Sequence, residues 1–195
     1  MKQNKYPIVC LLFLLSFLVG EVYAQQKPVR ILAIGNSFSQ DAVEQYLHEL
    51  ADDEDIPTII GNITIGGCSL ERHLRNARTN DSVYRYHKIG LNGKKVETKK
   101  VTMGMALADE EWDYVSLQQV SSSSGMYETF KASLPELVKY VKARLPKRTQ
   151  LMLHQTWAYD ANATNPGFKN YNCDQLTMYH LSLIHISEPT RLQLI

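Results

Sequence analysis

The chain has 195 residues, of which 44% are hydrophobic and 21% charged, a composition typical of one globular domain and not of a disordered chain. The first 24 residues contribute Lys2, Lys5 and Glu21, so the remaining chain has equal numbers of acidic and basic side chains. This balance gives no reason to expect nucleic acid or another polyanion as a partner.

The N-terminal residues have the pattern of a secretory signal peptide. Two lysines precede an apolar run from Ile8 to Gly20, and Val22-Tyr23-Ala24 follows as a cleavage site. The alternative is a membrane anchor, but this run is short for a helix that spans a bilayer. Because no second long apolar stretch follows, we expect residues 1–24 to be removed and the mature protein to be periplasmic or extracellular, without a membrane span.

Two cysteines remain after the leader, because Cys10 lies within it. In an oxidising compartment Cys68 and Cys173 can pair, but a domain of this size does not depend on a disulfide. A disulfide and two free thiols are therefore both compatible with the sequence.

The mature sequence begins with a strand and a helix. Val29 to Ile34 is a β-branched and apolar run that ends at Gly35, which predicts a buried parallel strand. Apolar residues then recur at helical spacing from Ala42 to Ala51, with Ser39 or Asp41 available as the cap.

The same order is repeated once. Ile59 to Ile65 predicts a second strand, which Gly66-Gly67 ends. Ser69 is the expected cap of a short helix that contains Leu70 and Leu74.

Between Tyr84 and Val101 the alternation of strands and helices breaks. Two polar, strand-like runs flank Asn92-Gly93, a dipeptide typical of a two-residue type I′ hairpin turn. We expect an exposed hairpin that is inserted into the fold and projects from its body.

The second half of the chain returns to alternating strands and helices. The predicted elements are a helix over Met103–Glu111, a strand over Tyr114–Gln118, an amphipathic helix over Phe130–Leu145, a strand over Thr149–His154 and a helix that begins near Asp174. This order predicts a three-layer α/β/α sandwich with a largely parallel, flavodoxin-like sheet, in which sites gather at the carboxyl ends of the strands.

The segment Gly35-Asn36-Ser37-Phe38-Ser39 connects the first strand to its helix. A tight turn there presents Ser37 beside helix N–H groups, as a nucleophile requires. A phosphate-binding loop is a second interpretation, although it favours more small residues and no Phe38; a capped turn without chemistry is a third. The lipase motif Gly-x-Ser-x-Gly is not matched, because Ser39 occupies its last position.

Two later strands also end in residues suited to catalysis, Gly66-Gly67 and Gln118-Gln119. In this order the three segments resemble the blocks of the SGNH (GDSL-type) hydrolase superfamily: Gly-Asp-Ser or Gly-Asn-Ser, a glycine N–H and a side-chain amide. Trp112-Asp113-Tyr114 before Leu117, and Thr156-Trp157-Ala158 after the fourth strand, resemble a bacterial subfamily of unassigned function within it. The resemblance extends from Val29 to His180.

The resemblance implies that Ser37 attacks an ester carbonyl. Its own N–H, an N–H of Gly66 or Gly67 and the amide of Gln118 would hold the oxyanion. Most of the superfamily has asparagine in the third block, and Gln118 is one methylene longer. The alternative for Gln118 and Gln119 is a solvated strand end. We expect no cofactor and no metal, because no His or Cys pair has ligand spacing.

The catalytic base expected from the resemblance is missing. The superfamily supplies it from Asp-x-x-His near the C-terminus, and that motif does not occur here. His154 is the nearest substitute, but we do not expect it to reach the nucleophile. Residues 181–195 resemble a peptide translated from sequencing-adapter DNA. We therefore expect a domain over residues 25–180, cut short before its catalytic Asp and His, with a non-native tail.

Together these features predict an exported serine esterase that removes acyl groups, acetyl above all, from a carbohydrate or small ester. This chain should be inactive without its base. Trp157 and Tyr159 offer rings that stack on a sugar, although Trp157 is equally suited to core packing. The alternative function is a non-catalytic glycan- or peptide-binding module on the same fold.

We predict that the exported protein begins at or near Gln25. Intact-mass measurement of periplasmic or secreted material should give the mass without residues 1–24, because the small residues before that point suit signal peptidase. Exported protein that retains the leader would contradict this prediction.

Overall fold

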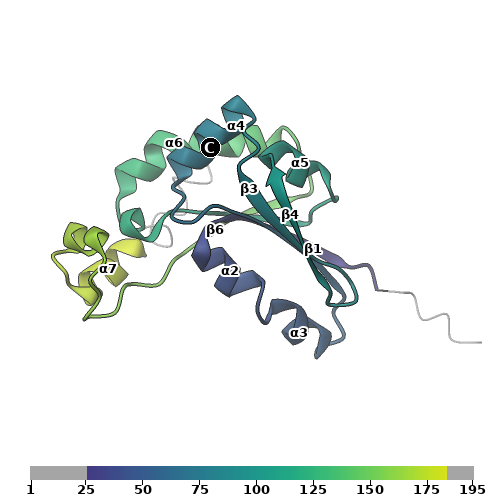
Figure 1. Ribbon diagram of the computed structural model, residues 1–195, viewed down its shortest axis with the longest axis horizontal. Coiled ribbons are helices and arrows are strands. Elements are labelled where there is room, and N and C mark those ends of the chain that lie inside the picture. Colours follow the sequence, from purple (N-terminus) through teal and green to yellow (C-terminus); the bar gives the residue numbers. More distant parts are fainter. Residues whose placement is uncertain (1–25, 184–195) are drawn as a thin grey trace, which may run out of the picture.

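The computed structural model describes residues 26–183, so the predicted leader and residues 184–195 of the predicted tail lie outside the described residues. A central sheet carries helices on both faces, with α2 and α3 on one face and α4, α5 and α6 on the other (Figure 1). Within the described range no helix is long and apolar enough to cross a membrane.

Six strands form one sheet in the order β4-β3-β2-β1-β5-β6. Their bounds are β1 (Val29–Gly35), β2 (Thr58–Thr64), β3 (Tyr84–Ile89), β4 (Lys95–Val101), β5 (Tyr114–Gln118) and β6 (Gln150–His154). The strands β2, β1, β5 and β6 are mutually parallel, whereas β3 and β4 run antiparallel to their neighbours. The prediction of an α/β fold is confirmed, with a sheet that is mixed.

The hairpin of β3 and β4 extends the sheet, so the prediction of a projecting insertion was wrong. β3 pairs with β2 from Ile60 to Thr64, and the side chains of Tyr84, Tyr86 and Ile89 are buried. Because β3 contains several polar residues, its sequence did not indicate that these positions are buried. Only the edge strand β4 is largely exposed.

The hairpin turn also differs from the predicted type I′, which needs positive φ at both central residues. The N–H of Gly93 donates to the carbonyl of Gly90 at 2.9 Å, and Gly93 has a φ of +70°. Asn92 has no positive φ; its side chain accepts the N–H of Lys94 instead. A turn followed by one left-handed glycine therefore connects the strands.

The helices follow the predicted order, and Ser69 caps α4 as predicted. The last helix, α7, begins near Asp174 as predicted, and the structure shows that Asp174 is its cap. The elements are α2 (Ser37–Val43), α3 (Leu47–Asp52), α4 (Leu70–Thr79), α5 (Met103–Ala108), α6 (Tyr127–Lys142) and α7 (Gln175–Ser182), with 3-10 turns η1 (Ser121–Ser123) and η2 (Pro166–Tyr171).

The first predicted helix is in fact two helices, α2 and α3. α2 begins earlier than predicted because Asn36 is its cap, accepting the N–H of Phe38, and neither Ser39 nor Asp41 has that role. Between the helices Glu44 turns inward, where its carboxylate accepts the amide of Asn62 at 2.7 Å.

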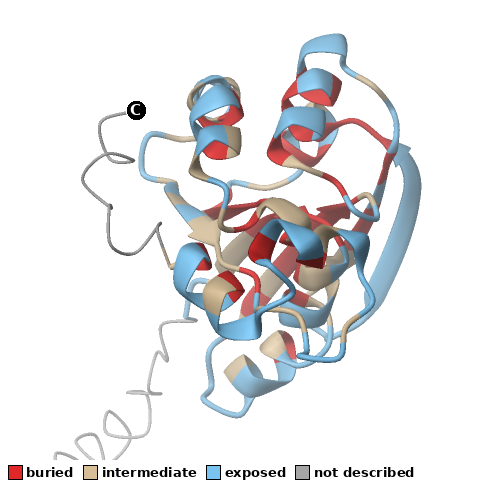
Figure 2. Ribbon diagram, turned by 90° about the vertical axis from the view of Figure 1, so that its left-hand side faces the viewer, coloured by how far each residue is buried: buried red, intermediate tan, exposed pale blue. Residues whose placement is uncertain are grey.

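The parallel strands contribute residues to two cores. Figure 2 shows buried residues, in red, along these central strands. Leu32 of β1 and Leu117 of β5 join the larger core, which also contains Leu137 of α6. Ala33 belongs to the smaller core beneath α2 and α3. Because successive strand residues point to opposite faces, Gln118 points to the face that α2 covers.

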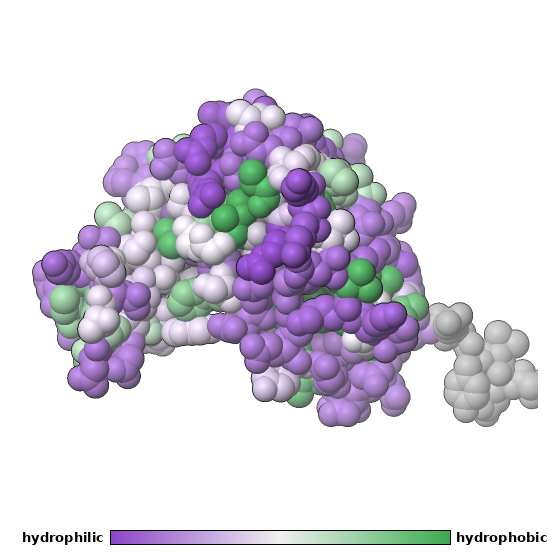
Figure 3. Space-filling view, viewed as in Figure 1, coloured by the Kyte–Doolittle hydropathy of each residue, from purple (hydrophilic) through white to green (hydrophobic). Residues whose placement is uncertain are grey.

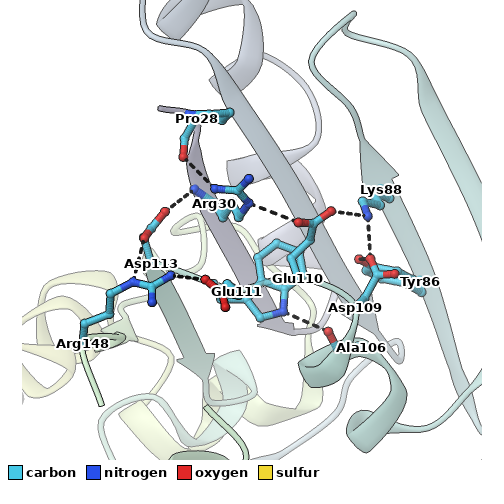
Figure 4. A network of polar contacts seen from close by, with 11 residues as sticks. Pro28, Arg30, Tyr86, Lys88, Ala106, Asp109, Glu110, Glu111, Asp113 and Arg148 are labelled. Atoms are coloured by element: carbon cyan, nitrogen blue, oxygen red, sulfur yellow. Dashed lines mark hydrogen bonds and ion pairs between the residues drawn. The ribbon is translucent and has the colours of Figure 1, made fainter. Parts of the chain in front are cut away.

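A network of charged residues lies at the amino ends of the parallel strands β1 and β5 and includes Lys88 of the antiparallel β3 (Figure 4). Arg30 donates to Glu110 at 3.1 Å, and its backbone N–H donates to Asp113 at 3.0 Å. Lys88 bridges Asp109 and Glu110. Asp113 therefore binds the amino end of β1, and Ser37 follows the opposite end of that strand.

We predict that Gly61→Ala lowers the free energy of unfolding by about 1–3 kcal/mol, because an added Cβ would lie 2.7 Å from the ring of Trp112 in the larger core. Gly66→Ala is the matched control, since nothing lies within 4 Å of its added Cβ. Urea unfolding of both variants measures the difference. Equal midpoints for Gly61→Ala and the unchanged chain would contradict the packing described.

Candidate functional site

Ser37 lies at the surface, at the carboxyl end of β1 and the start of α2. It lines a cleft of about 580 Å³ between the β1–α2 turn, η1 and the C-terminal lobe, which we define as residues 157–183. The lining residues are Ser37, Phe38, Ser121, Trp157, Ala158, Tyr159, Asp160, Ala163, Asn165 and Gln175. Figure 3 shows the outline hollowed between this lobe and the body. The Ser37 hydroxyl is therefore open to a ligand.

The residue before Ser37 connects three strand ends. Asn36 is 1% exposed, and its Nδ2 donates to the carbonyls of Cys68, after β2, and Gln119, after β5. Its Oδ1 caps α2 through the N–H of Phe38. One amide thus uses its donors and its acceptor to fix the turn that carries Ser37. Sequence reasoning treated Asn36 only as part of the Gly-Asn-Ser block.

Gln118 lies behind this turn with its amide fixed in one orientation. Its Oε1 accepts the backbone N–H of Asn36 at 3.2 Å, so its Nε2 must face His154, whose Nδ1 lies 3.1 Å away. Gln118 is 1% exposed, which excludes a solvated strand end. A Cβ on Gly35 would lie 2.7 Å from Oε1, so the glycine makes room for this amide.

Gln119 is also buried, at 2% exposure, and it holds α4 and α6 in place. Its Oε1 accepts the N–H of Leu70 at the start of α4, and its Nε2 donates to Thr129 of α6. The solvated alternative is therefore wrong for this residue too.

The structure brings the predicted strand ends into one network, but only part of the predicted site into the cleft. Ser37 lines the cleft, whereas Gln118 is buried beside it and Gly66 and Gly67 are exposed at the end of β2. Gly67 has a φ of +61°, the left-handed conformation that favours glycine. The oxyanion role of these three residues stays a prediction.

His154 has its Nδ1 already engaged. Because Nδ1 accepts from Gln118, the neutral ring carries its proton on Nε2. Burial lowers the pKa of His154, which favours this neutral form. His154 does not line the cleft around Ser37, so it remains unsuited to be the base.

The other buried histidines have structural partners. His73 is fully buried against the Tyr84 hydroxyl, at 2.9 Å, and burial lowers its pKa to about 3. His48 contacts Thr58 at 2.9 Å. His87 lies between two carboxylates, Glu44 and Glu97. None of these histidines lines the cleft.

Aromatic side chains form one wall of the cleft. Trp157 is 54% exposed and its ring centroid lies 4.4 Å from that of Phe38, so core packing of Trp157 is excluded. The Tyr159 hydroxyl lies 2.7 Å from the Ser121 hydroxyl, a pair that sequence reasoning missed. The run of serines at 121–124 was a visible signal, but nothing in it pointed to Tyr159.

The described residues offer no ligand set for a metal: within residues 26–183 no three His, Cys, Asp or Glu side chains form such a group. Cys68 and Cys173 are free thiols, the first buried and the second exposed. Burial raises the pKa of the Cys68 thiol to about 12, so it stays protonated at neutral pH.

The chain matches a family model and several solved structures. Residues 30–193 match the family described as "Domain of unknown function (DUF4886)". The crystal structure at 1.50 Å of a DUF4886 family protein from Bacteroides uniformis ATCC 8492 is 54% identical, with a TM-score of 0.83. That comparison covers 87% of this chain and 65% of the other, so the chain spans less than two thirds of its relative. None of the curated proteins compared with the chain matches it.

We predict that Asn36→Asp lowers the free energy of unfolding by roughly 2–4 kcal/mol, because a carboxylate oxygen would replace Nδ2 opposite the carbonyls of Cys68 and Gln119. Asn92→Asp is the matched control, since it makes the same change in an exposed turn and keeps the acceptor for Lys94. Urea unfolding at pH 7 measures both. A similar loss in the two variants would refute the role of Asn36.

Proposed function

The chain belongs to the DUF4886 family, and we propose that it is an exported serine esterase of the SGNH hydrolase type that removes acyl groups, acetyl above all, from a carbohydrate or small ester. The observation that carries the proposal is the position of Ser37. Its exposed side chain follows the central strand β1 and opens into a cleft with an aromatic wall. Nucleophilic catalysis needs a hydroxyl placed in this way, beside donors that hold developing charge.

The topology supports a site at this position. Taken alone, the parallel strands follow the order second, first, third, fourth, which is the start of a flavodoxin-like sheet. The helices after β1 cover one face and α6, after β5, covers the other, so the chain leaves these neighbouring strands in opposite directions (Figure 1). Ligands of open α/β sheets bind at such a switch point. Ser37 follows β1 and Gln118 is the last residue of β5, the two strands that flank it.

The proposed reaction is acyl transfer in two steps. The Ser37 oxygen attacks the ester carbonyl and gives its proton to a general base. The tetrahedral intermediate then breaks its bond to the alcohol oxygen, which takes that proton from the base, and an acyl-serine remains. Water attacks the acyl group, which leaves as a carboxylic acid while Ser37 regains its proton. Each step forms an oxyanion that the site must hold.

The proposal assigns the oxyanion to the N–H groups of Ser37 and of Gly66 or Gly67, and to the amide of Gln118. The contact between Gln118 Oε1 and the Asn36 N–H fixes the amide before a substrate binds, as preorganised stabilisation requires. One N–H of Nε2 faces His154, and the proposal uses the second.

The proposal places the general base outside residues 26–183, as an Asp-x-x-His pair in the full-length protein. The described histidines support this placement, because none lines the cleft and His154 already accepts through Nδ1. The longer solved relative supports it as well, since about a third of that chain has no counterpart here.

A non-catalytic binding module is the second candidate function. The observation that favours it is the same cleft, which offers an exposed Trp157 and several polar groups but no described histidine. A full-length protein that folds, binds sugars and hydrolyses no ester would support the module over the enzyme.

We predict that the full-length natural protein hydrolyses 4-nitrophenyl acetate and that Ser37→Ala lowers kcat by about 10⁴-fold or more, because the acyl acceptor is lost. The 195-residue chain should show little or no activity. Ser123→Ala is the matched control, since its hydroxyl lies outside the cleft of Ser37. Circular dichroism checks that each variant folds. Activity that survives Ser37→Ala would eliminate Ser37 as the nucleophile.

A further inference from the structure

We propose that the cleft beside Ser37 selects neutral or cationic oligosaccharides and rejects anionic ones, with Asp160 as a specificity-determining residue. This inference rests on the proposed function, because it names the class of carbohydrate that the same cleft accepts. It follows from the charge, the aromatic surface and the polar groups of the cleft wall.

The described residues that line the cleft include one acidic side chain and no basic one. Among the described lining residues none is lysine, arginine or histidine, and Asp160 alone is acidic. A uronate, sulfate or phosphate bound here would lose water without gaining a cation and would lie near a carboxylate. A neutral sugar meets no such penalty, and an amino sugar gains an attraction to Asp160.

The aromatic surface suits a sugar ring. The Trp157 ring packs on Phe38 and remains 54% exposed, so much of its surface faces solvent beside Ser37. Rings that are apolar on the face and polar at the edge fit the C–H face of a pyranose. The cleft volume of about 580 Å³ is within the range of sites for drug-sized ligands, which is room for more than one sugar ring.

The remaining polar groups are uncharged. The Tyr159 and Ser121 hydroxyls form a pair at 2.7 Å, and Asn165 and Gln175 are exposed residues that also line the cleft. Hydroxyls and amides both donate and accept, which matches the hydroxyl groups of a sugar. They provide no full charge to pair with an anion.

Asp160 is held where it can act on a bound sugar. Its Oδ1 accepts the N–H of Asn162 at 2.9 Å, which fixes the carboxylate on the loop that carries Trp157. The side chain is exposed, so water and salt screen its field. We therefore expect Asp160 to change affinities by about threefold, not by orders of magnitude.

Tryptophan fluorescence provides a direct test, because the two tryptophans differ in exposure. Trp112 is fully buried, so a ligand in the cleft is expected to change the emission of Trp157, and loss of that change in Trp157→Phe identifies it as the reporter. The probes are xylotetraose, the tetramer of glucosamine below pH 7 and the tetramer of galacturonic acid. The protein is the full-length Ser37→Ala variant, which binds without turnover.

We predict that xylotetraose or the glucosamine tetramer changes the Trp157 emission and that the galacturonic acid tetramer does not. Asp160→Asn should weaken the glucosamine tetramer about threefold at low salt and should leave xylotetraose unchanged, and 1 M NaCl should remove that difference. Asp53→Asn is the matched control and should have no effect, because Asp53 is an exposed carboxylate at the end of α3 that does not line the cleft.

Three outcomes would overturn the inference: tight binding of the galacturonic acid tetramer, an equal affinity of the glucosamine tetramer for Asp160→Asn and the parent, or no change of emission with any tetramer. Each is separate from the esterase assay. Ester hydrolysis that depends on Ser37 without sugar binding removes this inference and leaves the enzyme. Selective sugar binding without hydrolysis removes the enzyme and leaves the selective cleft.

Discussion

The buried amide of Asn36 is the contact on which the candidate site depends. It joins the carbonyls that follow β2 and β5 to the turn after β1, and it caps α2 at the same time. A carboxylate could not donate, and a shorter side chain could not reach both carbonyls. Because the amide is buried, each lost contact would leave an unpaired polar group, which is more costly than a missing surface contact. The position of Ser37 therefore follows from its neighbour.

The other wall of the cleft has a separate anchor. Tyr171 of η2 contacts the carbonyl of Ser122 and the N–H of Gly125, and Asn170 donates to the same carbonyl. The buried Phe168 and Met178 give the lobe a small core of its own. The β1–α2 turn thus faces a lobe that is hydrogen-bonded to η1 and the residues after it. Binding sites are commonly built in this way, from loops held on a rigid scaffold.

Several buried polar residues on the α2 face of the sheet bind one another and do not line the cleft. The Ser39 hydroxyl lies 3.0 Å from Asn62, Asn62 donates to Glu44, and Glu44 pairs with His87. This chain of contacts runs over β2 and joins α2 to the antiparallel hairpin. It also gives Glu97 a pKa below its usual range, through its hydrogen bond with His87. The side chains of Ser39, Glu44 and His87 therefore have structural hydrogen-bond partners.

The sequence by itself determined the features that arise within a few residues: the periodicity of strands and helices, the Ser69 cap, the start of the last helix near Asp174, and the turn that exposes Ser37. Only the tertiary structure decided the role of Asn36, the burial of Gln118 and the exposure of Trp157 against Phe38. Asn36 and Gln118 are 82 residues apart. Local pattern records which residue ends a strand, but the partner of a polar group depends on which distant strand ends lie beside it.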